Sequence, residues 1–354
     1  MNRALSLAER GRGRTSPNPL VGAVVVSRDG VIVGQGFHRR VGEPHAEVHA
    51  LEEAGALARG ATLYCTLEPC CHVGRTGPCV ERIVEAGVAR VVAAVEDPNP
   101  LVNGKGFEHL RGHGVNVEVG LGAAAARALN QPFFTLMREH RPFVVLKAAM
   151  SADGYIAEAP GKRTTLTSSE ANRHAHRVRA EVDAIGVGVG TILADDPTLT
   201  ARGAFRERPL VRVIFDRRLR TPAGAAVLST SHAGPVIIMT SVESARDDER
   251  RRPLEARGAV IEPMQGTTFR EALGRLADHQ VESLLLEGGA AVHAAAWDED
   301  VVDFVRLYVA PRTIGSGGVP FLDGRAFRSA DLVQRRVDQL GPDTLIEGYV
   351  HGPR

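Results

Sequence analysis

Apolar and polar residues alternate along the first part of the chain with two different periods. The β-branched runs at 21–27 and 31–37 are joined by Asp29-Gly30, which predicts a β-hairpin. Between 45 and 58, Val48 and Leu51 fall on one helical face, which predicts a helix. Further strands are expected over 61–67, 90–96 and 115–119, and further helices over 2–10, 78–86, 104–112 and 123–138, the last with a break at Pro132. This alternation predicts an α/β domain whose sheet is covered by helices.

The pattern restarts at Arg141-Pro142, because proline disfavours helix in the residue before it. Strands are then predicted over 143–151, 183–190, 210–216, 235–240, 283–287 and 304–310, and helices near 168–180, 268–278 and 290–296. The mixed-charge segment 244–253 is expected to be a solvated loop or helix face. The sequence therefore predicts two α/β domains, residues 1–141 and 142–354.

Composition narrows the classes of function. Hydrophobic residues make up 44% and charged residues 24%, values typical of globular proteins. The formal net charge is only +1 and aromatic residues are 5%, which argues against a nucleic-acid partner. No apolar run approaches the length of a membrane span, and residues 1–17 lack the apolar core of a secretory signal. We therefore expect a cytoplasmic protein with neither a nucleic-acid nor a membrane partner.

All the cysteines of the chain lie within residues 65–79. A disulfide scaffold spreads its cysteines along a small secreted domain, whereas a metal site clusters them. The segment EPHAEVHAL supplies His45 and Glu47, and TLEPCCHVGRTGPC supplies Cys70 and Cys79. The order His-x-Glu, Pro-Cys and a second Cys is typical of zinc-dependent nucleobase deaminases.

The residue types in this pattern suit hydrolytic deamination. One imidazole and two thiolates, from His45, Cys70 and Cys79, suit tetrahedral Zn²⁺ and leave its fourth position to water. Glu47 would take a proton from that water and later give it to the leaving amine. Residues two apart do not share a face in the middle of a helix. His45 and Glu47 must therefore both reach inward from the start of the helix.

Neighbouring residues leave alternatives open. His49 could share a metal with His45, Cys71 competes with Cys70 as a ligand, and Cys65 is expected in the core because its strand is apolar. One rival function is deamination of another base. Another is a non-enzymatic zinc-stabilised binding protein, which Glu47 argues against because purely structural zinc sites are usually closed by four ligands.

The chain resembles a known family in both halves. The segments SPNPLVGAVVV, GFHRRVGEPHAEVHAL, TLEPCCHVGRTGPC, EDPNPLVNGKG, LKAAMSADG, TILADDPTLTAR, VRVIFD and LLLEGGA resemble the bifunctional deaminase–reductase family of riboflavin biosynthesis. The CHVGRTGP insert between Cys70 and Cys79, longer than in most deaminases, belongs to that family. The resemblance implies a cytidine-deaminase-like domain followed by a dihydrofolate-reductase-like domain.

This resemblance also implies two reactions. The first is zinc-dependent hydrolytic deamination of 2,5-diamino-6-ribosylamino-4(3H)-pyrimidinone 5′-phosphate. The second is NADPH-dependent reduction of the ribosyl chain, which gives 5-amino-6-ribitylamino-uracil 5′-phosphate. About one zinc per chain, NADPH as the second cofactor and a homo-oligomer are implied with them.

The resemblance further assigns residues to each site. His45, Cys70 and Cys79 would be the zinc ligands, with Glu47 and Lys147 as the catalytic residues. The deaminase substrate would contact Asn18, His38, His72, Arg75, Asp97, Asn99 and Asn103. NADPH would contact Ala149, Thr165, Thr191, Asp195, Arg217, Gly289, Ala290, Ala291, Val292, His293, Ala294 and Ala295. The reductase substrate would contact Arg163, Arg179, Leu199, Arg202 and Glu287.

Two glycine-containing segments in the second half bear on the cofactor. GVGVGT at 186–191 does not match the GxGxxG fingerprint, and its alternation predicts a strand that runs into a loop. EGGA at 287–290 follows a predicted strand and opens a predicted helix, so its N–H groups could face a pyrophosphate. Lys147 could polarise the reacting sugar carbon or the ring oxygen.

Some residues of this half match the family pattern and others depart from it. Arg179 and Arg202 are natural phosphate clamps. Thr165 stands where the family commonly has an aromatic residue, and Arg163 where it commonly has a small polar one. Arg217 follows a predicted strand where a small polar residue is usual. It could bind the 2′-phosphate of NADPH through its planar guanidinium group, or it could simply be a solvated side chain.

Overall fold

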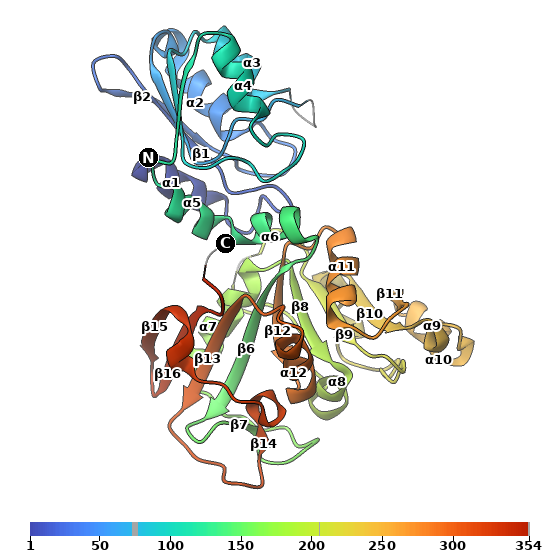
Figure 1. Cartoon of the computed structure of the whole chain (residues 1–354). Helices are drawn as coiled ribbons and strands as arrows, with labels where there is room; N and C mark the ends of the chain where they lie inside the picture. Colours follow the sequence, from blue (N-terminus) through green and yellow to red (C-terminus); the bar gives the residue numbers. More distant parts are fainter. Residues whose placement is uncertain (73–76, 205, 353–354) are drawn as a thin grey trace. The chain divides into compact units, whose positions relative to one another are not determined.

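A computed structural model describes residues 1–72, 77–204 and 206–352 of the chain. The chain divides into two compact units, Met1–Glu139 and His140–Gly352, which are described separately below (Figure 1). Within the described residues, every helix is too short or too polar to cross a membrane.

The first unit is a mixed sheet with helices packed on it. Its described strands are β1 (Gly22–Val26), β2 (Ile32–Phe37), β3 (Thr62–Cys65), β4 (Arg90–Ala93) and β5 (Asn116–Val119). They stand in the order β2-β1-β3-β4-β5, with β1 antiparallel to both neighbours and β3, β4 and β5 parallel. The helices are α1 (Asn2–Ala8), α2 (Ala46–Ala54), α3 (Cys79–Glu85), α4 (Lys105–Gly112), α5 (Ala123–Leu129) and α6 (Gln131–Glu139). The predicted hairpin and the predicted α/β alternation are confirmed.

Helix α2 lies unusually close to strand β2. A Cβ atom on Gly34 would lie 2.1 Å from the Ala50 carbonyl oxygen, and one on Gly36 would lie 2.4 Å from that of Ala46. Only glycine allows this approach, because real side chains do not reach such distances. The two glycines therefore fix the position of the start of α2, which carries His45 and Glu47.

The break between α5 and α6 falls at Asn130 instead of the expected Pro132. The Asn130 side chain accepts a hydrogen bond from the Leu20 N–H (2.7 Å) and donates one to the Leu20 carbonyl (2.9 Å). This pairing ends α5. Pro132 is then the second residue of α6, where proline is tolerated because the first N–H groups of a helix have no partner within it.

The second unit is built on one large sheet. Its strands among the described residues are β6 (Phe143–Ser151), β8 (Ala184–Gly188), β9 (Val211–Phe215), β10 (Val236–Ser241), β11 (Ala259–Met264), β12 (Ser283–Gly288), β13 (Phe304–Ala310), β15 (Val333–Leu340) and β16 (Asp343–Tyr349). They stand in the order β11-β10-β9-β8-β12-β6-β13-β16-β15. The strands from β11 to β13 are parallel, and the β15–β16 hairpin extends the sheet antiparallel.

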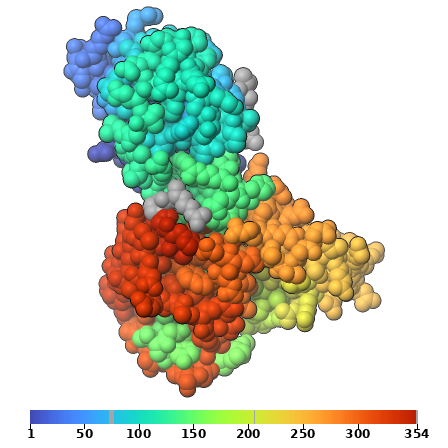
Figure 2. All heavy atoms as spheres, viewed as in Figure 1, coloured from blue at the N-terminus to red at the C-terminus, as the bar shows by residue number. Residues whose placement is uncertain are grey.

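Helices cover both faces of this sheet. They are α7 (Ser169–Glu181), α8 (Val189–Asp195), α9 (Val242–Ala245), α10 (Asp248–Glu255), α11 (Phe269–Asp278) and α12 (Ala290–Asp298). In β12, Leu284 and Leu286 pack with the core that contains α11, while Leu285 packs on the opposite side with Val178 of α7. The short strands β7 (Tyr155–Ala157) and β14 (Val319–Pro320) pair with each other in a separate two-stranded sheet. Two segments far apart in sequence therefore lie side by side in this unit (Figures 1 and 2).

This unit differs from the sequence expectation in the residues after β8 and in five strands that were not predicted, β7, β11, β14, β15 and β16. The residues after β8 form α8 where a loop was expected, because Val189 and Ile192 are buried on one helical face. The mixed-charge segment was expected to be a solvated loop or helix face, and this is confirmed: it contains the largely exposed helix α10, whose N-terminal N–H groups at Glu249 and Arg250 donate to the Asp247 side chain. Strand β15 carries no buried residue, so apolar periodicity could not predict it.

Candidate functional site

Three side chains of the first unit form a compact group of metal-ligand atoms. His45 Nδ1 lies 3.2 Å from Cys79 Sγ and 3.4 Å from Cys70 Sγ. His45 is the N-cap of α2 and Cys79 is the first residue of α3, while Cys70 lies in the loop after β3. All three ligand atoms lie within 4.8 Å of one another.

This group fits a zinc ion. Ligand atoms bound tetrahedrally to one zinc lie about 3.5 Å apart, which is close to both sulfur–nitrogen distances. A hydrogen bond from the Cys79 thiol, followed by one from His45, lowers the pKa of Cys70 to about 4, although burial opposes this change. Cys70 is therefore a thiolate at neutral pH, the form that binds metal.

The competing residues lie outside this group of ligand atoms. Cys71 Sγ faces the Leu101 carbonyl at 3.7 Å, and Cys65 is fully buried in β3, as expected for a core residue. His49 Nδ1 lies 4.0 Å from a carboxylate oxygen of Glu52. Within the described residues, the predicted ligand set His45, Cys70 and Cys79 is thus the one that the fold brings together.

Glu47 lies in the first turn of α2 and is only 3% exposed. Its carboxyl group interacts with the Cys79 thiol, while Oε2 is buried and has no hydrogen-bond partner in the described part of the chain. Burial raises the pKa of Glu47 to about 7. His45 has extended φ and ψ of −74° and 167°, so it lies outside the helical part of α2. The rotation of about 100° between successive helical residues therefore does not separate its side chain from that of Glu47, and both side chains reach the candidate metal centre.

The predicted polar residues around this centre fall into two hydrogen-bonded groups. Asn18 Nδ2 lies 3.1 Å from His38 Nε2, and the His38 ring lies edge-on to the His45 ring at 5.3 Å between centroids. Asp97 Oδ1 accepts from the Asn99 N–H at 2.8 Å, and Asn103 Nδ2 donates to the Asp97 carbonyl at 3.0 Å.

His72 and Arg75 are the remaining predicted contacts of the deaminase substrate. His72 is half-buried, and its Nδ1 has no partner among the described residues. Arg75 lies outside the residues that the structure describes.

Glu68 organises this region and was missed by sequence reasoning. Its carboxylate accepts from the backbone N–H groups of Asp97 (3.2 Å), Gly104 (2.9 Å), Gly106 (2.9 Å) and Phe107 (3.3 Å). These bonds tie the Asp97–Asn103 loop to the start of α4. The Glu-Pro-Cys motif was the available signal, but backbone acceptors have no sequence signature of their own.

In the second unit, a cavity of about 410 Å³ lies at the carboxyl ends of β6, β8 and β12. Ten of the predicted reductase residues line it: Lys147, Ala149, Arg179, Thr191, Asp195, Leu199, Glu287, Gly289, Ala290 and His293. Arg179 Nε and Nη2 donate to the two carboxylate oxygens of Glu287 at 2.7 and 2.6 Å. Lys147 Nζ lies 3.9 Å from Glu287 Oε2.

Burial and charge set the protonation of this cluster. Burial alone would raise the pKa of Glu287, but the charges of Arg179 and Lys147 outweigh it and lower that pKa to about 2. Burial lowers the pKa of Lys147, against the attraction of Glu287. Burial also lowers the pKa of His293 to about 4, so this ring is neutral at pH 7. The cluster of Arg179, Glu287 and Lys147 therefore contains one anion and two cations.

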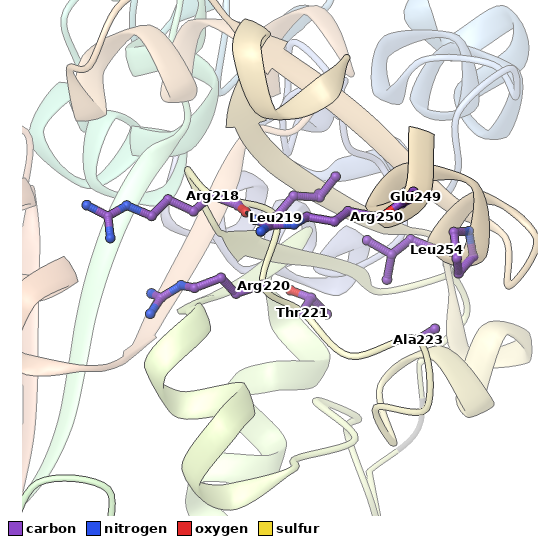
Figure 3. A pocket seen from close by; sticks show the side chains of 9 residues that line it. Arg218, Leu219, Arg220, Thr221, Ala223, Glu249, Arg250 and Leu254 are labelled. Carbon is purple, nitrogen blue, oxygen red and sulfur yellow. Dashed lines mark hydrogen bonds between the residues drawn. The ribbon is translucent and has the colours of Figure 1, made fainter. Parts of the chain in front are cut away.

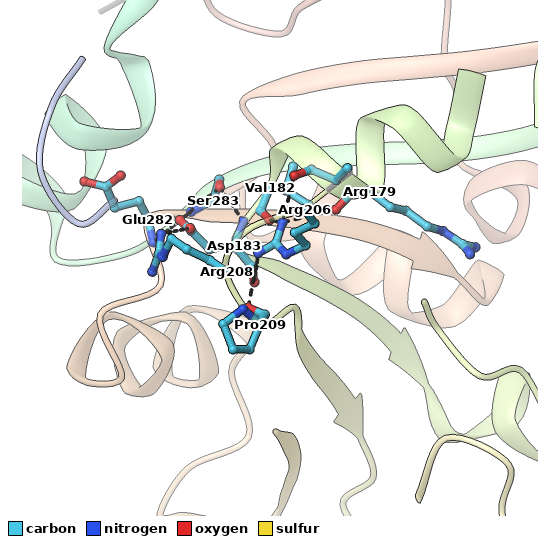
Figure 4. A network of polar contacts seen from close by, with 9 residues as sticks. Arg179, Val182, Asp183, Arg206, Arg208, Pro209, Glu282 and Ser283 are labelled. Atoms are coloured by element: carbon cyan, nitrogen blue, oxygen red, sulfur yellow. Dashed lines mark hydrogen bonds and ion pairs between the residues drawn. The ribbon is translucent and has the colours of Figure 1, made fainter. Parts of the chain in front are cut away.

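Arg206 stabilises the backbone at the C-terminal end of α7, the helix that carries Arg179. Arg206 Nη1 donates to the carbonyls of Arg179 (3.4 Å), Ala180 (2.9 Å) and Val182 at the end of α7. Arg208 Nη1 adds an ion pair with Asp183 at 2.8 Å. Figure 4 shows this network, with the Arg179 side chain directed away from it. Sequence reasoning missed Arg206.

A neighbouring cavity of about 420 Å³ lies between the loop after β9 and the start of α12. The predicted cofactor residues Thr191, Arg217, Gly289, Ala291, Val292 and Ala295 line it. The N-cap of α12 is Gly289, with φ +83°, and no side chain of the described residues caps this helix. Its first N–H groups can therefore bind an anion such as a pyrophosphate.

Four predicted reductase residues do not line either cavity. Arg163, Thr165 and Arg202 are exposed, and Ala294 is buried within α12. Next to the first two, Lys162 and Thr164 line the 410 Å³ cavity in their place.

Comparison with known proteins covers both units. Residues 142–346 match the family described as RibD C-terminal domain, and residues 1–95 match the cytidine and deoxycytidylate deaminase zinc-binding region. The chain is 41% identical to the riboflavin biosynthesis protein RibD of Aquifex aeolicus (98% of this chain, 96% of the relative). It is 40% identical to the protein of the same name from Escherichia coli (98% and 97%).

Solved structures agree with these relatives. Acinetobacter baumannii RibD is similar with a TM-score of 0.87 and 37% identity, covering 98% of this chain and 96% of that one. A Thermotoga maritima diaminohydroxyphosphoribosylaminopyrimidine deaminase/5-amino-6-(5-phosphoribosylamino)uracil reductase is similar with a TM-score of 0.83 and 35% identity, with the same coverage.

Proposed function

This chain belongs to the RibD family of riboflavin biosynthesis proteins, and we propose that its residues divide the work of this bifunctional enzyme as follows. Residues 1–141 are the zinc-dependent deaminase, and residues 142–354 are the NADPH-dependent reductase. The substrates are small pyrimidine molecules. The deaminase converts 2,5-diamino-6-ribosylamino-4(3H)-pyrimidinone 5′-phosphate and water into the aminouracil and ammonia. The reductase then converts the ribosyl chain to ribityl, giving 5-amino-6-ribitylamino-uracil 5′-phosphate.

In the deaminase, His45, Cys70 and Cys79 hold the zinc. When bound, zinc supplies Lewis acidity that makes water a nucleophile near neutral pH. Glu47 accepts the proton of the attacking water at its carboxylate and delivers it to the leaving amine. Its burial beside Cys79, with Oε2 free of hydrogen-bond partners among the described residues, supports this role.

Polar residues around the centre bind and orient the substrate. Asn18 and His38 form one polar wall, and Asp97, Asn99 and Asn103 form the other, held by Glu68. His72 adds a ring nitrogen to these contacts. We assign Arg75 to the 5′-phosphate, because its planar guanidinium group suits a phosphate.

In the reductase, NADPH supplies a hydride when bound, and the side chains of the 410 Å³ cavity hold the substrate. The Lys147 ammonium is positioned by Glu287 and can hydrogen-bond the oxygen on the reacting sugar carbon. Arg179 uses Nε and Nη2 on Glu287 and Nη1 on the Thr200 carbonyl. These bonds use three of the five N–H groups of its guanidinium. We therefore assign Arg179 both to positioning Glu287 and, together with the exposed Arg202, to the substrate phosphate.

The observation that carries the deaminase assignment is the buried Glu47 carboxylate beside the His45–Cys70–Cys79 group. The test is a coupled assay on the diaminopyrimidine 5′-phosphate that measures ammonia and NADPH oxidation separately. Equal amounts of both are expected. Ammonia release without NADPH oxidation would favour a deaminase acting alone, and neither product would favour a zinc-stabilised binding protein.

We further assign the enzyme to the cytoplasm and to a homo-oligomer. Zinc binding by Cys70 and Cys79 needs reduced thiols, which the cytoplasm maintains. Light scattering on the zinc-loaded protein measures the mass of the assembly, and a monomer at micromolar concentration would contradict the second assignment.

A further inference from the structure

The segment after α8 carries two of the residues assigned to the reductase substrate, Leu199 and Arg202, and it has no regular secondary structure. Leu199 is 2% exposed, has φ +51° and lines the 410 Å³ cavity. The Arg202 guanidinium group is exposed and has no hydrogen-bond or ion-pair partner in the described part of the chain. This cation can therefore bind a phosphate, provided that the backbone around it is held in place.

Helix α7 holds this segment through two side chains that are three residues apart. His176 Nδ1 accepts a hydrogen bond from the Arg202 N–H at 3.1 Å. Arg179 Nη1 donates to the Thr200 carbonyl at 3.1 Å. Residues three apart are neighbours on one face of a helix, so both contacts come from the face that presents Arg179 to the cavity.

These two contacts respond differently to protons. The guanidinium group keeps its charge at any working pH, whereas His176 accepts from the Arg202 N–H only while Nδ1 carries no proton. His176 is half-buried and is faced by Arg179 from its own helix, by Arg202 from the segment and by Glu287 from β12. Burial and then the two arginines lower the pKa of His176, against Glu287 and the Thr200 backbone. The ring is therefore neutral at pH 7, and protonation of Nδ1 in acid would break the bond to Arg202.

We propose that His176 is a positioning residue of the reductase, whose unprotonated Nδ1 holds the Arg202 backbone so that the Arg202 guanidinium group meets the substrate phosphate. The inference rests on the proposed reductase function and goes beyond it by adding a residue that lines neither cavity. His176 therefore acts through Arg202. A released segment must be ordered again when the phosphate binds, so loss of this bond raises KM and leaves kcat unchanged.

The test compares His176→Asn and His176→Leu with the wild type. Asparagine can place its amide oxygen where Nδ1 lies and so keeps an acceptor that does not titrate, whereas leucine removes the acceptor. KM and kcat are measured with the deaminated substrate and saturating NADPH between about pH 5.5 and 8, the range in which histidine changes charge. Because the substrate phosphate titrates in this range with every protein, each KM is divided by that of His176→Asn at the same pH.

Arg250→Leu is the matched control, because Arg250 also holds a loop through one backbone hydrogen bond. Its Nη1 donates to the Arg218 carbonyl at 2.8 Å, beside a cavity of about 640 Å³ between α10 and the loop after β9 (Figure 3). No described residue that we assign to the reductase substrate lines that cavity. Ammonia release and the fluorescence of Trp297 on unfolding show that both units of each variant are folded.

His176→Leu should raise KM about three- to tenfold at neutral pH, the effect of one lost hydrogen bond, with kcat unchanged. His176→Asn should match the wild type at neutral pH. On acidification, the KM of the wild type should rise relative to that of His176→Asn and approach that of His176→Leu. Arg250→Leu should follow the wild type at every pH. In an Arg202→Ala background, His176→Leu should have no further effect on KM.

The proposal would be overturned if the wild type and His176→Asn had the same pH profile, or if both substitutions of His176 raised KM equally. An undiminished effect of His176→Leu in the Arg202→Ala background would also overturn it, because His176 would then not act through Arg202. Wild-type protein that does not oxidise NADPH with the deaminated substrate would instead overturn the reductase function itself.

Discussion

Glu287→Gln is the substitution that most directly tests the charge cluster of the reductase cavity. Glutamine keeps the shape of the side chain but removes the negative charge that pairs with Arg179 and Lys147. The Glu287 side chain is 6% exposed, so water cannot replace the lost partner. Two half-buried cations are then left without an anion, a change that is destabilising.

The magnitude follows from the pKa of Glu287, which falls from 4.5 to about 2 in the folded protein. At about 1.36 kcal/mol per pH unit, ionised Glu287 contributes about 3 kcal/mol to the free energy of unfolding. Because the folded pKa is lowered, this contribution is present above pH 4.5 and is lost as the pH falls toward 2. By pH 3.5, about 1 kcal/mol of it should be gone.

Urea unfolding followed by tryptophan fluorescence measures this effect in the second unit alone, because Trp297 in α12 is the single tryptophan. The control is Asp298→Asn. Arg325 Nε and Nη2 donate to Asp298 at 2.7 and 2.6 Å, so the bond geometry matches while solvent screens the pair. Glu287→Gln should lower the unfolding free energy by about 3 kcal/mol at pH 7, with little change in Asp298→Asn. The reasoning would be refuted by equal effects of both, or by a deficit of Glu287→Gln that is the same at pH 7 and pH 3.5.

Cys79→Ser should lose both bound zinc and ammonia release, measured by metal analysis and assay, while Cys71→Ser should keep both because its sulfur lies outside the ligand group. Glu47→Gln should keep zinc but release no ammonia, since an amide cannot carry the proton. The control Glu52→Gln, on the same helix, should behave as wild type. Ammonia release by Glu47→Gln near the wild-type rate would contradict the role of Glu47. Arg206→Ala should lower the unfolding free energy of the second unit by about 1–3 kcal/mol and raise the reductase KM, because the end of α7 and with it Arg179 lose their support. Unchanged KM in Arg206→Ala would show that Arg179 is positioned by Glu287 alone.

The zinc centre was predictable from the sequence because its ligands sit in short motifs at the ends of elements. Metal coordination needs particular atoms, so His45, Cys70 and Cys79 stand out by residue type. The close approach of α2 to β2 at Gly34 and Gly36, which fixes the start of α2 and with it His45, follows no pattern of apolar residues. Glu68 escaped notice for a related reason, because its partners are backbone N–H groups that every residue has.

The reductase cavity was less predictable because strand order decides which residues meet. Lys147 and Glu287 are neighbours because β6 and β12 lie side by side with Leu146 opposite Leu286. Arg179 reaches Glu287 across 108 residues of sequence. Alternating strands and helices predict a parallel sheet but leave this order open.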